Sequence, residues 1–123
     1  MKLLHDCVRD VLLTLEDKLG VFGGLGDNQL DLPKYSSDDI KYTILKLNEA
    51  GYITCSKSDL VGNIYIKSIT YQGHLFLDNI RDNNVWKKTK SIASKFSSTS
   101  LTIISSIASQ VIAELISKQL NNP

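Results

Sequence analysis

The chain has 123 residues, of which 42% are hydrophobic and 22% charged, a size that suits one compact domain with an extension. Lys and Arg number 14 against 13 Asp and Glu, so the formal charge of +1 excludes an overall field that would draw the protein onto nucleic acid or a membrane. Two cysteines are too few for the disulfide framework of a small secreted domain. The start, MKLLHDCVRD, lacks the long apolar core of a signal peptide, so we expect a cytoplasmic protein.

The first segment has the pattern of an amphipathic helix between Leu3 and Leu19. Its apolar residues recur every three or four positions: Leu4, Cys7, Val8, Val11, Leu12, Leu15 and Leu19. Gly20 is expected to end this helix, at a position where positive φ favours glycine. The glycine-rich stretch VFGGLGDNQLDLP then predicts a loop with one short strand candidate around residues 29–32.

The clearest local pattern is YSSDDIKYTILKLNEAGYI, at residues 35–53. Ser36 or Ser37 can cap a helix there, acidic residues follow in its first turn, and Gly51 ends it. Two β-rich runs, YITCSK and NIYIKSI, then bracket the turn SDLVGN and predict a hairpin. Thr70 is expected to cap the next helix, in which Gly73 allows close packing against the sheet.

The C-terminal third divides into two helices separated by polar breaks. Asp82–Asn84 forms the first break, and a basic helix is predicted from Val85 to about Phe96. Residues 97–100 form the second break, and Ser100 can cap a last helix that ends before Asn121. The order of elements predicts a mainly α fold with a small β-hairpin (α+β): a winged helix-turn-helix-like domain at residues 1–82, followed by a C-terminal helical extension at residues 83–123.

No pattern in the chain indicates catalysis, a cofactor or a metal site. His5 and Cys7 are two residues apart on a helix and point in different directions, and Cys55 and His74 lie in other predicted elements. The glycines of GVFGGLG lack the Lys-Ser/Thr of a phosphate-binding loop. We therefore expect a protein that is not an enzyme.

A basic patch is the strongest candidate for nucleic-acid contact. The helix before the hairpin starts with Asp38 and Asp39, and two carboxylates there would repel phosphates, which argues against base readout by that helix. The basic helix lacks acidic residues and could neutralise a few phosphates. The predicted contact residues are Lys41, Lys46, Lys57, Lys87, Lys88, Lys90 and Lys95. The alternative is a solvated lysine face on a packed helix.

The last helix carries an apolar stripe broader than a peripheral helix needs. We expect it to join subunits of a homo-oligomer, although folding back over its own domain is the alternative. The predicted interface residues are Leu101, Ile104, Ile107, Ala108, Val111, Ile112, Leu115 and Ile116. Serines, glutamines and Glu114 argue against insertion in a membrane, so no membrane partner is expected.

Three segments carry a resemblance to a known family: HDCVRDVLL near the start, LNEAGYI in the middle, and GHLFLDNIRDNNVWKKTK after the hairpin. They resemble a group of small phage and prophage proteins known as domain of unknown function 2513. The resemblance covers most of the chain. It implies a mobile element in a bacterial host and a winged-helix-like core, and it supplies no catalytic residues.

Two functions follow as hypotheses. The first is a winged-helix accessory or regulatory protein of a phage or prophage that binds nucleic acid. The second is a winged-helix module that binds protein and inhibits or redirects a host factor, for example a defence component. The acidic start of the helix at residues 36–50 and the near-neutral charge favour the second hypothesis.

Overall fold

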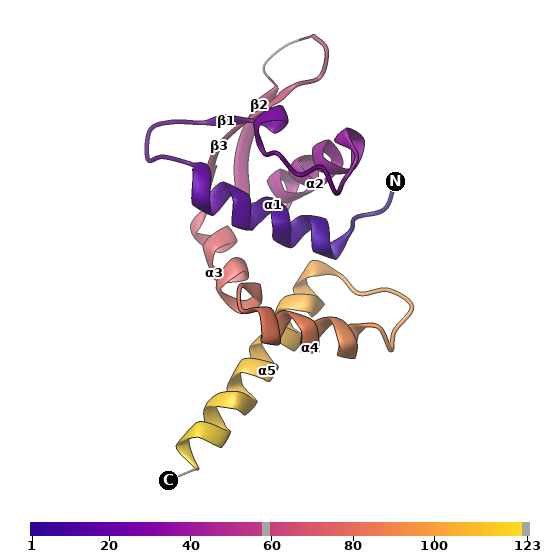
Figure 1. The fold of residues 1–123 in the computed structure, drawn as a ribbon, viewed down its shortest axis with the longest axis vertical. Helices are drawn as coiled ribbons and strands as arrows, with labels where there is room; N and C mark the ends of the chain where they lie inside the picture. The colour runs from indigo at the N-terminus through magenta and orange to yellow at the C-terminus, as the bar shows by residue number, and fades with distance from the viewer. Residues whose placement is uncertain (58–59, 122–123) are drawn as a thin grey trace. The chain divides into compact units, whose positions relative to one another are not determined.

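The computed structural model describes residues 1–57 and 60–121, except for the side chain of Lys57. Within that part the protein is α+β, with five α-helices and one three-stranded antiparallel sheet (Figure 1). The chain divides into two compact units, Met1–Leu77 and Asp78–Pro123. Each unit buries apolar side chains of its own.

The first unit contains two long helices, a short 3₁₀ helix and the sheet. Its strands lie in the order β1-β3-β2, all antiparallel, with Leu25 of β1 opposite Ile66 of β3. The predicted hairpin is therefore present, and a third strand extends it. The elements are α1 (His5–Lys18), β1 (Leu25–Gly26), η1 (Asp27–Gln29), α2 (Ser37–Glu49), β2 (Ile53–Lys57), β3 (Ile64–Ile69) and α3 (Tyr71–Ile80), whose last turn belongs to the second unit.

The core of the first unit lies where α1 and α2 pack on each other, with α1 contacting β3 and α2 contacting β2. In β3, Ile64 and Ile66 are buried, whereas Tyr65 and Lys67 are exposed. This alternation is typical of a strand that is covered on one face only. Burial of each large aliphatic side chain stabilises the fold by roughly 1.5–3 kcal/mol. The predicted stripe of α1 is buried at Cys7, Val8, Val11, Leu12 and Leu15.

Capping residues fix the ends of the helices beside the sheet. Ser36 accepts a hydrogen bond from the Asp39 N–H at 3.1 Å, and Gly51, with φ of 80°, ends the helical segment. Thr70 accepts from the Gly73 N–H at 3.1 Å. A Cβ on Gly73 would lie 2.0 Å from the Tyr52 carbonyl oxygen, so only glycine fits where α3 crosses the backbone that enters β2.

The predicted strand at residues 29–32 is wrong: β1 lies earlier, Gln29 ends the 3₁₀ helix, and residues 30–32 are irregular. The Gly26 N–H donates to Gln29 Oε1 at 2.8 Å, which closes the turn. Asp31 has φ of 54°, in the left-handed region that interrupts extended backbone. Gly20 follows the end of α1 as predicted but is not among the described glycines with positive φ.

The second unit contains the last turn of α3, α4 (Asn83–Ala93) and α5 (Leu101–Leu120). Asp82 caps α4 by accepting from the Val85 N–H at 2.9 Å, and Ser100 caps α5 by accepting from the Ile103 N–H at 3.2 Å. The two helices pack against each other, and Asn79 donates to Ser105 Oγ at 3.0 Å. The helix predicted at residues 85–96 thus begins and ends slightly earlier.

Candidate nucleic-acid interface

The buried face of α4 positions the basic residues on its other side. Val85, Trp86, Thr89 and Ala93 are buried, and the Thr89 hydroxyl donates to the Val85 carbonyl at 2.7 Å. These residues recur at helical spacing, so they take up one side of α4. The indole of Trp86 belongs to the buried side and is not available as a platform for stacking with bases.

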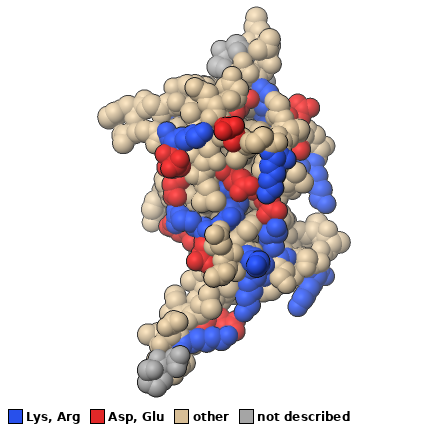
Figure 2. Space-filling view, viewed as in Figure 1, with Lys and Arg blue, Asp and Glu red and all other residues tan. Residues whose placement is uncertain are grey.

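The lysines of α4 occupy the exposed side of the helix. Lys87, Lys88 and Lys90 are exposed, and Lys95 is exposed just after the helix ends. Between Asp82 and Glu114 the chain has no acidic residue. We call these four residues the lysine face; the Lys and Arg side chains that gather over α4 are blue in Figure 2.

Lys41 is engaged inside the first unit. Its Nζ lies 2.9 Å from the Asp27 carboxylate and donates to the Gly62 carbonyl at 3.1 Å and to Asn63 Oδ1 at 3.4 Å. Asp27 is 6% exposed and also accepts from the Ile64 N–H at 2.8 Å. This network ties α2 to the start of β3, so the Lys41 amine has a structural role and is already bound to three partners within the first unit.

Lys46 is half-buried and interacts with residues of its own helix. Its Nζ lies 2.9 Å from the Glu49 carboxylate and 5.3 Å from the centre of the Tyr42 ring. The hydrogen bond and charge of Glu49 raise the pKa of Lys46. The side chain of Lys57, the remaining predicted contact residue, lies outside the described part of the chain.

The residues predicted to join subunits lie along α5 and differ in burial. Ile104, Ala108 and Val111 are buried; Leu101, Ile107 and Ile112 are intermediate; Leu115 and Ile116 are exposed. By length and composition alone α5 could span a membrane, and only 17% of its most apolar window is buried. The first half of the stripe therefore serves the second unit, and the second half faces solvent.

Among the described residues, no group of three or more His, Cys, Asp or Glu side chains could hold a metal ion. Cys7 and Cys55 are free thiols, and burial raises the pKa of both.

A cavity of about 240 Å³ in the first unit is lined by α1, the following loop, the end of β3 and His74 of α3, with Glu16, Ser68 and His74 as its polar side chains. The Ser68 hydroxyl shares a hydrogen bond with the Thr54 hydroxyl at 2.8 Å.

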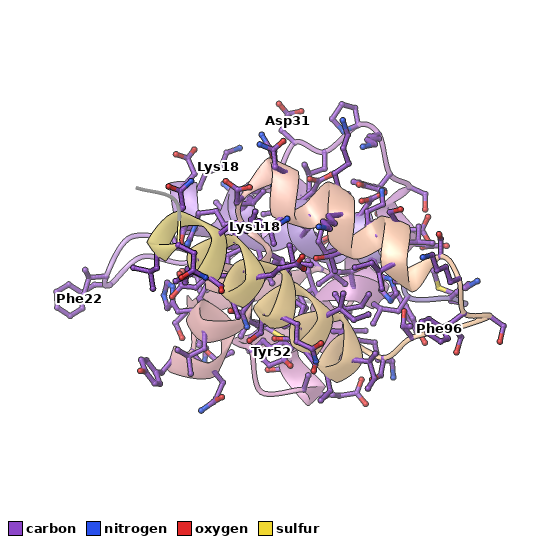
Figure 3. The ribbon with its side chains drawn as sticks, turned by 90° about the horizontal axis from the view of Figure 1, so that it is seen from below. Lys18, Phe22, Asp31, Tyr52, Phe96 and Lys118 are labelled. Atoms are coloured by element: carbon purple, nitrogen blue, oxygen red, sulfur yellow. The ribbon has the colours of Figure 1, made fainter. Side chains whose placement is uncertain are left out.

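Two features of the first unit were not anticipated from the sequence. Asp27 was not singled out, because its partners lie far along the chain. The loop tips are apolar and exposed: Val21 is 89% and Phe22 100% exposed, and Leu60 and Val61 are exposed beside the turn between β2 and β3. Phe22 extends from its loop clear of neighbouring side chains (Figure 3). Gly20 and Gly23, on the two sides of Val21–Phe22, indicate a loop and were the sequence feature that could have predicted the exposure of these two side chains.

Comparisons with known proteins give a family and one relative. The family model described as "Hypothetical protein (DUF2513)" matches residues 2–100, which end just before α5. An "Uncharacterized protein" of Haemophilus influenzae is 29% identical over 119 residues, covering 94% of this chain and 99% of that protein. No solved structure matches. The family match confirms the resemblance to domain of unknown function 2513 that the sequence indicated.

Proposed function

The chain belongs to the DUF2513 family, and on that premise we propose that it is a non-enzymatic phage or prophage protein that binds nucleic acid in the bacterial cytoplasm. The observation that carries the proposal is the lysine face of α4. Four exposed lysines lie in a stretch without acidic residues, three of them on a helix whose other side is buried and the fourth, Lys95, just after its end. They would bind phosphates rather than read bases, because lysine is a point charge and no arginine accompanies them.

The topology of the first unit supports a winged-helix relationship. A helix, a short strand, a 3₁₀ turn and a second helix precede an antiparallel pair, and β1 adds to β3 to give the order β1-β3-β2. In such folds the helix before the hairpin enters the major groove. In this chain α2 begins with Asp38 and Asp39 and uses Lys41 internally. We therefore propose that the first unit orients the protein and that α4 supplies the phosphate contacts.

The test is fluorescence anisotropy of a labelled DNA duplex at 50 and 200 mM salt. If the four lysines each neutralise one phosphate, affinity should fall roughly 100-fold between these concentrations, since the slope is about −0.9 per phosphate. Changing Lys87, Lys88 and Lys90 to Glu should abolish binding and remove most of the salt dependence. The matched control changes Lys2, Lys34 and Lys67 to Glu, the same charge difference on exposed residues of the first unit.

Equal loss of binding in both triple variants would show that binding depends on net charge and would refute the lysine face as the contact surface. Absence of duplex binding in the unmodified protein would refute nucleic acid as the partner. Single-stranded DNA and RNA of the same length should be titrated in parallel, because phosphate contact without base readout predicts binding to more than one of these nucleic acids.

The second candidate is a protein-binding module that acts on a host factor. The exposed apolar tips at Val21–Phe22 and Leu60–Val61 favour it, because exposed aromatic and aliphatic side chains at loop ends suit a protein pocket better than a phosphate backbone. Changing Val21 and Phe22 to Ser should release a stoichiometric host protein captured from lysate, while the lysine-face variant should retain it. Capture that is unaffected by Val21 and Phe22 would remove the support for this candidate.

A further inference from the structure

The last turns of α5 extend past the helix that supports it. Ile104, Ala108 and Val111 are buried in the first part of α5, which packs against α4. From Ala113 to Asn121 every residue is exposed, including Leu115 at 42%, Ile116 at 53% and Leu120 at 81%. The apolar stripe thus continues into solvent without a described neighbour in its own unit.

The exposed part is a direct continuation of the buried stripe. Ile104, Ala108, Val111 and Leu115 follow one another at intervals of four, three and four residues, which keeps them on one side of a helix. Ile112 and Ile116 widen that side. A helical end with no packing partner is only marginally stable in water. Another surface packed against Leu115 and Ile116 would stabilise the end of the helix and remove these apolar side chains from water.

The charged residues beside the apolar stripe indicate which binding partner fits it. Glu114 and Lys118 form an ion pair at 3.6 Å, and their spacing places both on the same flank of the stripe. The opposite flank carries Ser109 and Ala113 and no charge. When two identical helices pair antiparallel, each flank meets the same flank of its partner. Glu114 of one copy would then meet Lys118 of the other, twice by symmetry.

We propose that the second half of α5 binds the second half of α5 from another copy of the chain in antiparallel orientation, with Leu115 and Ile116 at the centre. A parallel pair would place the charged flank against the uncharged one and leave Glu114 and Lys118 without new partners. Only the last turns of α5 take part, so we expect less buried area than the roughly 1,200 Å² of a stable interface, and therefore a weak dimer with an affinity in the micromolar range. This inference is independent of the nucleic-acid proposal.

Sedimentation equilibrium of the full chain from 1 to 300 µM tests the proposal. The unmodified protein should dimerise reversibly. Changing Leu115 and Ile116 to Glu should give a monomer that still unfolds cooperatively in urea, with any loss of helix by circular dichroism limited to the last turns of α5. The control is Ile103→Glu, which places one glutamate at an exposed apolar residue outside the stripe and should still dimerise; Leu115→Glu alone, which adds the same single charge within the stripe, should weaken the dimer. A monomer at every concentration, or dimers that survive the double change, would overturn the proposal.

Charge reversal tests the orientation. Glu114→Lys alone and Lys118→Glu alone should each weaken dimerisation about tenfold, because each turns two attractions across the dimer into repulsions. The double exchange, Glu114→Lys with Lys118→Glu, should restore it. Single reversals without effect would overturn the antiparallel arrangement. Binding to phosphatidylglycerol–phosphatidylethanolamine vesicles by a protein that remains monomeric in buffer would identify a lipid surface as the occupant and overturn the second copy.

Discussion

Replacing Asp27 with Ala should be among the most destabilising single changes in the first unit. The carboxylate accepts from the Ile64 N–H at 2.8 Å and from Lys41 Nζ at 2.9 Å while only 6% exposed. Breaking a buried ion pair by removing one partner costs about 3–5 kcal/mol. Lys41 is partly exposed and keeps two neutral acceptors, Gly62 O and Asn63 Oδ1, so we expect about 3 kcal/mol.

A double-mutant cycle separates the charge pair from the backbone hydrogen bond. Asp27→Asn retains an acceptor for the Ile64 N–H and should cost about 1–2 kcal/mol, the loss of the charged contact. Lys41→Met should cost about 1 kcal/mol, because Asp27 keeps its backbone donor. The double variant should cost less than the sum of the two by at least about 1 kcal/mol.

Urea unfolding followed by far-ultraviolet circular dichroism gives these free energies. A loss below about 0.5 kcal/mol for Asp27→Ala would contradict a stabilising buried ion pair between Asp27 and Lys41. The same variants also separate stability from binding. Lys41→Met should leave duplex affinity unchanged at a temperature where the protein is folded, in contrast to the lysine-face variants.

Three further predictions concern packing, thiol reactivity and pH. Gly73→Ala should destabilise the protein by about 2–3 kcal/mol in urea unfolding, because the added Cβ has no room beside the Tyr52 carbonyl. Gly23→Ala, whose Cβ meets no atom within 4 Å, should be neutral. Equal effects of the two changes would contradict the close approach of Gly73 to Tyr52. A thiol reagent at pH 8 should label Cys55 within minutes and Cys7, which is 0% exposed, only on unfolding; two equally fast thiols would contradict its burial. Burial and the hydrogen bond to the Asp10 carboxylate raise the pKa of Tyr35 above its ordinary 10.0. The unfolded state therefore loses this proton at a lower pH than the folded state, and the free energy of unfolding should fall as pH rises above 10.0. Tyr35→Phe should flatten that part of the pH profile.

Local patterns predicted most of the helices because the decisive contacts lie within a few residues. Ser36 caps α2 through the N–H three residues later, and Gly51 ends the helical segment through its own positive φ. Ser100 and the polar break before it marked the start of α5 in the same way. These signals are complete in the sequence because they need no distant partner.

The errors arose where a distant contact overrides the local pattern. Residues 29–32 alternate as a strand would, but the backbone at Asp31 is left-handed and Leu30 turns into the core. The candidate site shows the same limit. Lys41 resembles the other exposed lysines in sequence, and its partner Asp27 lies 14 positions earlier at the far side of a loop. Only the lysines of α4, whose helix faces follow from spacing, could be placed from sequence.

The burial of Trp86 in the second unit has a spectroscopic consequence. It is the only tryptophan of the chain, and all five tyrosines lie between residues 35 and 71, in the first unit. Indole emission excited at long wavelength therefore comes from a side chain of the second unit, and phenol absorbance comes from side chains of the first. The chain carries a separate intrinsic chromophore for each compact unit, so the order in which they melt can be observed without attaching any dye.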